Sequence, residues 1–263
     1  MIIVKIGGGN GININGIISD LAAINERFII VHGANALRDK LADSLGTPKQ
    51  TLTSVKGYSS VYSDEKLLDV MMMAYAGLRN KRIVEMCHQH GINAVGLSGL
   101  DGKVIQGRRN RGIRVEKYGK KKIIRDYSGK PEAINEGLLH LLLDNGYTPV
   151  LTVPIIDEHN VAINTENDDV VRVLQKSMQA DTIINLIEAP GFLEDMEDES
   201  SVISKISPQE LEDREQQVEG RMKRKMMSFR KLFEHGASRV IISDGRIEHP
   251  VADALTGKGT VIA

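Results

Sequence analysis

Residues 2–9 read IIVKIGGG, a run of mostly β-branched residues that ends at three glycines. Residues 28–33, FIIVHG, repeat this design, and between the two runs apolar residues from Ile17 to Ile24 recur at helical spacing. Short apolar runs rich in β-branched residues are typical of buried strands. The first 33 residues therefore predict a β-α-β unit with parallel strands and a right-handed crossover.

Strand and helix patterns alternate along the rest of the chain. We expect further strands at residues 92–97, 149–153, 181–187, 239–243 and 260–262, and helices from Ser63 to Cys87, over 131–145, after Asp169 through Gln175, from Ser207 and over 220–235. The polar residues 102–130, with turn signals at Gly119 and Gly129, predict a β-hairpin. This alternation predicts an α/β fold around a mainly parallel sheet, with a weak division near residue 180.

Composition restricts the class of protein. The 263 residues carry 34 Lys and Arg against 35 Asp and Glu, a net charge of −1 that gives no global case for nucleic-acid binding. Hydrophobic residues at 41% and charged residues at 26% exclude wholesale disorder. The single cysteine, Cys87, excludes an intrachain disulfide and a zinc cluster built on cysteines, and favours a reducing cytoplasm. The apolar runs are too short to span a bilayer, and the N-terminal run is typical of a first strand, not of a signal peptide.

The glycine loop at residues 7–11 is a candidate phosphate site. Glycines after a buried strand allow backbone N–H groups to turn toward an anion. The spacing fits neither the dinucleotide fingerprint nor a Walker A motif, and a flexible turn explains the loop equally well. Lys5 is the only charge in the first strand, and it could neutralise a transferring phosphoryl group or reach water from an edge strand.

The second loop, after His32 and Gly33, would face the same crevice as the first if the two strands are parallel neighbours. His32 could be catalytic, but a histidine buried in the core fits its place at the end of an apolar strand better. Residues 164–169, NTENDD, hold three carboxylates and two amides, which could bind Mg²⁺, orient catalytic lysines or cap a helix. The basic residues at 221–225 favour an anionic ligand or a solvated helix face.

Residues 103–130, which we call the basic segment, are the strongest charge anomaly. Eleven Lys and Arg stand against Glu116 and Asp126 alone, which gives +9. Nucleic acid is one possible partner, but Tyr118 and Tyr127 are its only aromatics, few for base stacking. An acidic protein partner and a merely solvated hairpin are the alternatives.

Seven motifs resemble those of the amino acid kinase family, over almost the full chain. They are VKIGG at 4–8, VHG at 31–33, NKR at 80–82, GLSGLDG at 96–102, AINT at 162–165, GRMKRK at 220–225 and GTVI at 259–262. They are similar to the motifs of N-acetylglutamate kinases. The arginines after Gly102 and the RDYSG stretch at 125–129 resemble more closely the kinases that act on α-aminoadipate or glutamate attached to an acidic amino-group carrier protein.

The resemblance implies a three-layer α/β/α sandwich of the amino acid kinase and carbamate kinase type. Residues 1–180 would bind the acyl acceptor and form a homodimer, and residues 181–263 would bind ATP, with Mg²⁺ held by its phosphates and no metal site on the protein. The carried-over roles are as follows: catalytic Lys5, Asp168 and Lys225; phosphate-binding Gly8, Gly9 and Gly33 through backbone N–H groups; substrate-binding Gly33, Ala34, Val61 and Asn164; nucleotide-binding Asn185, Gly191 and Lys223; and carrier-docking Arg108, Arg109, Arg111 and Arg114.

Three positions depart from the family pattern. Val61 stands where the family has an arginine for the substrate's α-carboxylate, Ala34-Asn35 follow Gly33 where further small residues are usual, and Glu166 replaces Asp or Asn. Loss of a bidentate carboxylate clamp is a large change and leaves the acceptor open. We expect a cytoplasmic kinase of lysine or arginine biosynthesis that makes an acyl phosphate on a carrier-bound amino acid. The alternatives are a kinase of free N-acetylglutamate and a nucleotide-sensing homologue with weak or no catalysis.

Overall fold

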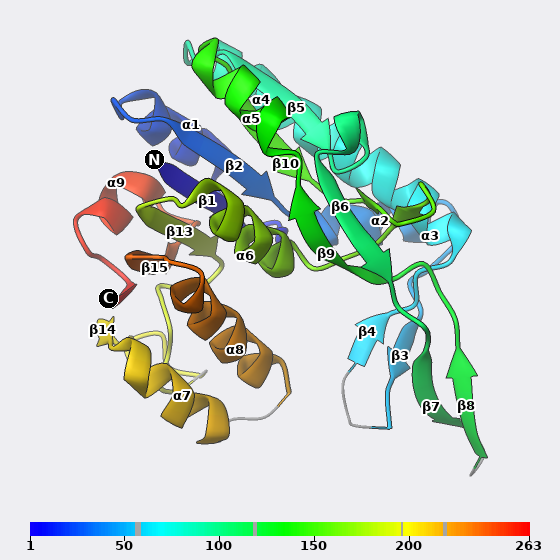
Figure 1. Cartoon of the computed structure of the whole chain (residues 1–263). Coiled ribbons are helices and arrows are strands. Elements are labelled where there is room, and N and C mark those ends of the chain that lie inside the picture. The colour runs from blue at the N-terminus through cyan, green and yellow to red at the C-terminus, as the bar shows by residue number, and fades with distance from the viewer. Residues whose placement is uncertain (56–58, 118–119, 196, 218–219) are drawn as a thin grey trace.

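The N-terminal β-α-β unit forms the centre of an eight-stranded sheet in the computed structural model (Figure 1). The structure describes residues 1–55, 59–117, 120–195, 197–217 and 220–263, without the side chains of residues 59, 117, 120, 217 and 220–225. In spatial order the strands are β14 (Lys205–Ile206), β16 (Thr260–Ile262), β15 (Arg239–Asp244), β13 (Thr182–Ile187), β1 (Ile2–Ile6), β2 (Phe28–His32), β10 (Thr148–Thr152) and β5 (Ala94–Ser98). β15 and β16 are antiparallel, and the other neighbours in this sheet are parallel.

Helices cover both faces of the sheet, because the central strands carry buried apolar residues on both of their faces. Val4 and Ile30 pack with α1 (Ile14–Ala22), α4 (Asn80–Gln89) and α9 (Pro250–Leu255). Ile3 and Ile29 belong to the core on the opposite face. That core also contains residues of α3 (Glu65–Met71), α5 (Glu136–Asp144), α6 (Asn167–Met178), α7 (Pro208–Gln217) and α8 (Gly220–Glu234). The predicted three-layer α/β/α sandwich is thus confirmed, and its sheet continues across the expected division near residue 180 at the β1–β13 pair.

The basic segment forms a long two-part hairpin. Its base is β6 (Ile105–Arg109) paired with β9 (Gly129–Ile134), and its outer part is β7 (Ile113–Lys117) paired with β8 (Lys120–Ile124). β6 also pairs with β11 (Ile155–Ile156), which pairs with β12 (Ala162–Ile163). A smaller hairpin of β3 (Thr51–Thr53) and β4 (Ser59–Val61) lies beside the outer part (Figure 1). The predicted hairpin is confirmed.

Three predicted helix boundaries were wrong. The helix expected after Asp169 through Gln175 is α6, which runs from Asn167 to Met178, so Asp168 and Asp169 lie in its first turn and not in a loop before it. The helix expected from Pro131 begins only at Glu136, because residues up to Ile134 pair with β6 and Asn135 caps the helix through the Leu138 N–H. A register shift opposite Pro131, between Gln106 and Gly107, accommodates a residue that cannot donate to the ladder. The helix expected from Ser63 begins at Glu65, and Asp64 caps it, since the Asp64 carboxylate accepts from Leu67 N at 2.8 Å.

The long helix predicted from Ser63 to Cys87 is continuous, and its middle is a π-helix. This segment, η1 (Met72–Arg79), joins α3 to α4 and includes Gly77. α2 (Asn35–Ser44) follows the second glycine loop and contacts η1. π-helical turns concentrate at functional sites. No helix in the described part of the chain is both long and apolar enough to cross a membrane.

The contact between His249 and Asp20 predicts a pH-dependent stability. His249 Nδ1 lies 3.0 Å from Asp20 Oδ1, and this hydrogen bond raises the pKa of His249 above its ordinary value. Because the folded-state pKa is the higher one, the stabilisation is present below about pH 6.5 and is lost as pH rises through the folded pKa. In urea unfolding, the stability advantage of the wild type over His249→Ala should shrink between about pH 6 and about pH 9. A constant difference over this range would contradict the assignment.

Candidate active site

Three loops meet at the carboxyl ends of β1, β2 and β13. β1 lies between the other two strands and is parallel to both, so residues 7–13, 33–34 and 188–191 leave the same edge of the sheet. The chain passes from β1 to β2 on one side while β13 joins on the other, which makes β1 a topological switch point. Ligands of parallel α/β sheets bind in the crevice outside such a point. The two glycine loops therefore lie next to each other at the middle of this sheet edge.

Gly8 and Gly33 let the first two loops touch. A Cβ on Gly8 would lie 2.6 Å from Asn35 N and 2.8 Å from Ala34 N, and one on Gly33 would lie 3.0 Å from Gly8 Cα. The Gly8 carbonyl accepts from Ala36 N at 3.0 Å, which ties the first loop to the start of α2. Glycine is required here for close approach of two backbones, as a phosphate cradle needs.

The backbone donors of these loops differ from the prediction in one respect. The Gly33 N–H donates to Ile6 O at 2.9 Å, so in this structure it is not free to bind a phosphate. The N–H groups of Gly8 and Gly9 have no hydrogen-bond partner among the described residues. The phosphate-binding assignment therefore rests on Gly8 and Gly9.

A carboxylate already sits on the first loop. Gly11 N donates to Glu188 Oε1 at 2.6 Å, and a Cβ on Gly9 would lie only 1.8 Å from Glu188 Oε2. Arg79 Nη2 donates to Gly9 O at 3.1 Å, and burial lowers the pKa of Arg79 while Glu188 opposes that shift. The loop thus accommodates an oxyanion, and the Glu188 carboxylate shows where it does so.

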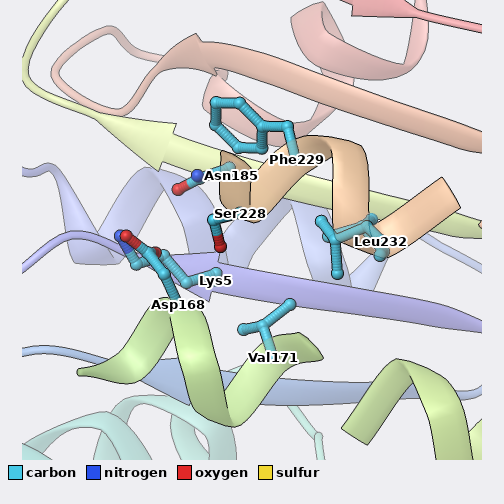
Figure 2. A pocket seen from close by; sticks show the side chains of 8 residues that line it. Lys5, Asp168, Val171, Asn185, Ser228, Phe229 and Leu232 are labelled. Atoms are coloured by element: carbon cyan, nitrogen blue, oxygen red, sulfur yellow. The ribbon is translucent and has the colours of Figure 1, made fainter. Parts of the chain in front are cut away.

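Lys5 and Asp168 form an ion pair on one face of the sheet. Lys5 Nζ lies 3.1 Å from Asp168 Oδ1, with the Lys5 side chain 14% exposed and that of Asp168 36% exposed. Asp168 lies in the first turn of α6, and its side chain points toward that of Lys5 on β1 (Figure 2). A cation held at this place can neutralise charge on a transferring phosphoryl group.

A small cavity adjoins this pair. Its lining consists of Lys5, Asp168, Val171, Ile183, Asn185, Ser228, Phe229 and Leu232. Asn185 is the register neighbour of Lys5 on β13, is 6% exposed, and has an Oδ1 with no partner in the described part of the chain. Figure 2 shows the Ser228 hydroxyl pointing toward Lys5 from α8. The other lining side chains, Val171, Ile183, Phe229 and Leu232, are apolar. An apolar surrounding strengthens the electrostatic interaction between Lys5 and Asp168.

Several buried polar atoms around the loops lack partners among the described residues. They are Arg79 Nε, Thr165 Oγ1, Asn167 Oδ1 and Asn185 Oδ1. Buried polar atoms are nearly always hydrogen-bonded in folded proteins, so such a set indicates a site completed by a polar ligand.

His32 is a structural residue. It is fully buried, its Nε2 accepts from Asn80 Nδ2 at 3.1 Å, and its Nδ1 therefore carries the proton toward Gly33 O at 3.3 Å. Burial lowers the pKa of His32 to about 3, so the imidazole is neutral at physiological pH. The interpretation of His32 as a core histidine is confirmed.

Comparison with known proteins agrees with this geometry. The model of the amino acid kinase family matches residues 1–244. The chain belongs to the amino acid kinase family. It is 41% identical over 268 residues to the LysW-aminoadipate kinase of Thermus thermophilus, with 100% of both chains covered. It is 31% identical to the LysW-aminoadipate/LysW-glutamate kinase of Saccharolobus solfataricus, covering 100% of this chain and 99% of that one. The fold is similar to that of a Giardia carbamate kinase, with a TM-score of 0.69 at 14% identity over 99% and 97% of the two chains.

Three residues to which the resemblance gives a substrate-binding role lie in the second loop (Ala34), at the end of β4 (Val61) and directly after β12 (Asn164). Ala34 is buried at the N-cap of α2, and Val61 packs against the core that contains residues of α3, α5 and α6. Asn164 donates through Nδ2 to Ser63 Oγ at 3.0 Å. Val61 offers no charge for a substrate carboxylate, so the family's arginine clamp is absent at this position.

The residues to which the resemblance gives a nucleotide-binding role do not lie together in one described site. Asn185 lies beside Lys5, so it belongs to the ion-pair region. Gly191 is buried against Thr260, where a Cβ would lie 2.9 Å from Thr260 Oγ1, so its missing side chain serves packing. The side chains of residues 221–225, which include the predicted Lys223 and Lys225, lie outside the described part of the chain.

The four arginines assigned to docking do not behave alike. Arg108, Arg111 and Arg114 are exposed. Arg109 differs from the expectation, because its Nε donates to Asp126 O at 2.7 Å and its guanidinium lies 3.9 Å from the Tyr127 ring centroid. Stacking and hydrogen bonding hold Arg109 in the base of the hairpin.

Three further residues at the site escaped the sequence analysis. Ser228 lies three residues after Lys225 in a predicted helix, and that spacing places both on one face. Arg79 and Glu188 reach the first glycine loop from η1 and from the end of β13. Glu188 directly follows a predicted strand, a position that in parallel sheets points to the ligand edge. No comparable signal marks Arg79.

Proposed function

We propose that the chain is an ATP-dependent kinase that converts a side-chain carboxylate into an acyl phosphate. The acceptor we propose is α-aminoadipate or glutamate carried on an acidic amino-group carrier protein, in lysine or arginine biosynthesis. Family membership and the names of the two relatives support this proposal. The observation that carries it is the Lys5–Asp168 pair beside two touching glycine loops.

The proposed reaction transfers the γ-phosphoryl group of ATP. A carboxylate oxygen of the acceptor attacks the γ-phosphorus, the bond from phosphorus to the β-γ bridging oxygen breaks, and its electron pair leaves with ADP. Lys5 offsets the charge on the transferred group, Asp168 holds Lys5 in place, and the N–H groups of Gly8 and Gly9 bind phosphate oxygens. Lys225 would act as a second cation. Mg²⁺, bound through the ATP phosphates, would supply further charge neutralisation.

The basic segment supports the proposal that the acceptor amino acid is attached to a carrier protein. A free amino acid needs no docking surface, whereas an acidic protein is attracted and oriented by a cluster of exposed cations. Arg108, Arg111 and Arg114 supply such cations on a hairpin that extends from the sandwich (Figure 1).

ATP consumption with each acceptor tests the proposal. We expect ADP and an acyl phosphate, trapped as a hydroxamate, when the carrier bears a terminal aminoadipyl or glutamyl group. Activity on free N-acetylglutamate with none on the carrier would favour the first alternative. ATP binding without turnover on either acceptor would favour a nucleotide-sensing protein.

Charge reversal on the basic segment should weaken carrier binding. For Arg111→Glu/Arg114→Glu we expect carrier association at low salt to slow by about tenfold or more, because long-range attraction accelerates encounter. Wild-type affinity should fall steeply between about 0.02 M and about 0.15 M salt, as screening predicts. Titration by surface plasmon resonance measures both.

The matched control is Arg27→Glu/Lys40→Glu, which reverses two exposed cations outside the basic segment. Background ATP hydrolysis should survive in both double variants. Salt-independent carrier binding, or an equal loss in the control, would contradict docking on this hairpin.

We further propose that residues 1–180 bind the acceptor and form a homodimer, and that residues 181–263 bind ATP. Two large apolar side chains on η1, Met73 and Leu78, are 46% and 49% exposed and are suited to a dimer contact. The single thiol, Cys87, is buried, and burial raises its pKa to about 12, in keeping with a cytoplasmic protein. Light scattering of the purified chain tests the dimer.

A further inference from the structure

The one buried acid of the basic segment, Asp126, organises its base. Its side chain is 2% exposed in a stretch otherwise dominated by cations. Asp126 Oδ2 accepts from Ser63 N at 3.1 Å, and Oδ1 accepts from Ser128 N at 3.1 Å and Ser128 Oγ at 2.6 Å. Burial of a carboxylate is costly unless hydrogen bonds satisfy it, so these contacts hold the two serines in fixed positions.

Ser63, which Asp126 holds in place, in turn binds the side chain of Asn164. Ser63 is fully buried, and its Oγ accepts from Asn164 Nδ2 at 3.0 Å while donating to Val61 O at 3.3 Å. Its carbonyl accepts from Tyr127 N at 2.7 Å. Every polar group of Ser63 is therefore used, and one of the two Nδ2 hydrogens of Asn164 has an assigned partner.

The backbone of Asn164 is held by the same strand segment. Asn164 N donates to Tyr127 O at 2.7 Å, and Gly129 N donates to Asn164 O at 2.9 Å. Asn164 is thus fixed through its main chain by residues 127–129 and through its amide by Ser63. With one N–H on Ser63, the Asn164 amide cannot rotate freely, and its other N–H and its Oδ1 take defined directions.

Arg109 and Tyr127, both in the basic segment, extend this hydrogen-bond network. Arg109 donates to Asp126 O and stacks on Tyr127, and the Tyr127 hydroxyl donates to Glu65 Oε1 at 2.6 Å. A continuous path of hydrogen bonds and the Arg109–Tyr127 stack therefore joins the base of the hairpin to Asn164. Residues from four separate parts of the chain, near 63, 109, 126 and 164, meet within it.

We propose that Ser63 and Asp126 are positioning residues of the acceptor site, which lock the Asn164 amide and tie its orientation to the base of the basic segment. The inference rests on the proposed function, in which Asn164 holds the acceptor. A carrier seated on the hairpin then presents its carboxyl group to a preset amide. Such preorganisation lowers the cost of binding the acceptor in reactive geometry.

A double-mutant cycle between Ser63 and Asn164 tests the inference. Ser63→Ala removes the acceptor of the Asn164 amide, and we expect KM for the loaded carrier to rise about fivefold to tenfold, the effect of one lost hydrogen bond, with KM for ATP unchanged. Ser63→Ala/Asn164→Ala should match Asn164→Ala alone, because Ser63 acts through Asn164. Independent, multiplicative effects on KM would overturn the proposal.

Asp126→Asn should also raise KM for the carrier while leaving KM for ATP unchanged. The matched control is Asp20→Asn, since Asp20 is another buried carboxylate that accepts two backbone N–H bonds, from Val251 and Ala252, on the opposite face of the sheet. Its variant should lose thermal stability without a change in carrier KM. An equal rise in KM in the Asp20 variant would show that general destabilisation explains the result.

Hydrogen exchange separates this inference from the proposed function. In Ser63→Ala, the amides of Asn164 and Gly129 should exchange faster than in the wild type, whichever acceptor the enzyme uses. If the wild type phosphorylates no carrier, the proposed function fails, and exchange still decides whether Ser63 orders Asn164. Unchanged exchange rates at both amides would overturn the proposal that Ser63 positions Asn164, even if the enzyme is an active kinase.

Discussion

Turnover should fall by about 10²-fold or more when Lys5 is replaced by Ala, the effect expected when one preorganised charge-stabilising group is lost. Lys5 stands at the end of β1, 3.1 Å from Asp168, where no other described cation lines the cavity. Lys225→Ala should show a loss of the same order, since the resemblance gives it the second cationic role. Initial rates at saturating ATP and acceptor measure both effects.

Lys258→Ala is the control for these variants. Lys258 lies between two glycines, Gly257 and Gly259, and its side chain is 69% exposed and pairs with Asp253. Its removal should leave turnover unchanged, because an exposed ion pair of this kind contributes little. Near-normal turnover in both Lys5→Ala and Lys225→Ala would refute the phosphoryl-stabilising assignment.

Asp168→Asn should lower turnover by about tenfold to 10²-fold while the circular dichroism spectrum stays that of the wild type. The substitution keeps the size of the side chain but removes the negative charge that pairs with Lys5 and orients it. The loss should appear in kcat more than in KM for ATP, because the pair faces the transferring group.

Asp169→Asn is the neighbouring control. Asp169 shares the first turn of α6, but its carboxylate lies 3.4 Å from Arg172 Nε. This variant should retain turnover. An unfolded Asp168→Asn protein would instead identify Asp168 as a helix-capping residue with no direct part in the reaction.

The sequence alone determined the centre of the fold and the main chemical groups. The β-branched runs at 2–6 and 28–32 became the adjacent central strands, because a run that is apolar on both faces has no stable place except between two helical layers. Lys5 and the acids near residue 168 were candidates by type and by position at strand and helix ends. Their meeting at 3.1 Å follows from the parallel topology, which the alternation of patterns predicted.

Only the tertiary structure decided which partner satisfies each polar group. The Gly33 N–H binds Ile6 O, Arg109 turns onto Tyr127, and Asn185 lies beside Lys5, none of which local patterns indicate. Asp126 finds Ser63, 63 residues away, and Asn164 finds the same serine across 101 residues. A residue's chemistry is local, but the satisfaction of a buried donor or acceptor depends on groups that only the folded chain brings within hydrogen-bond distance.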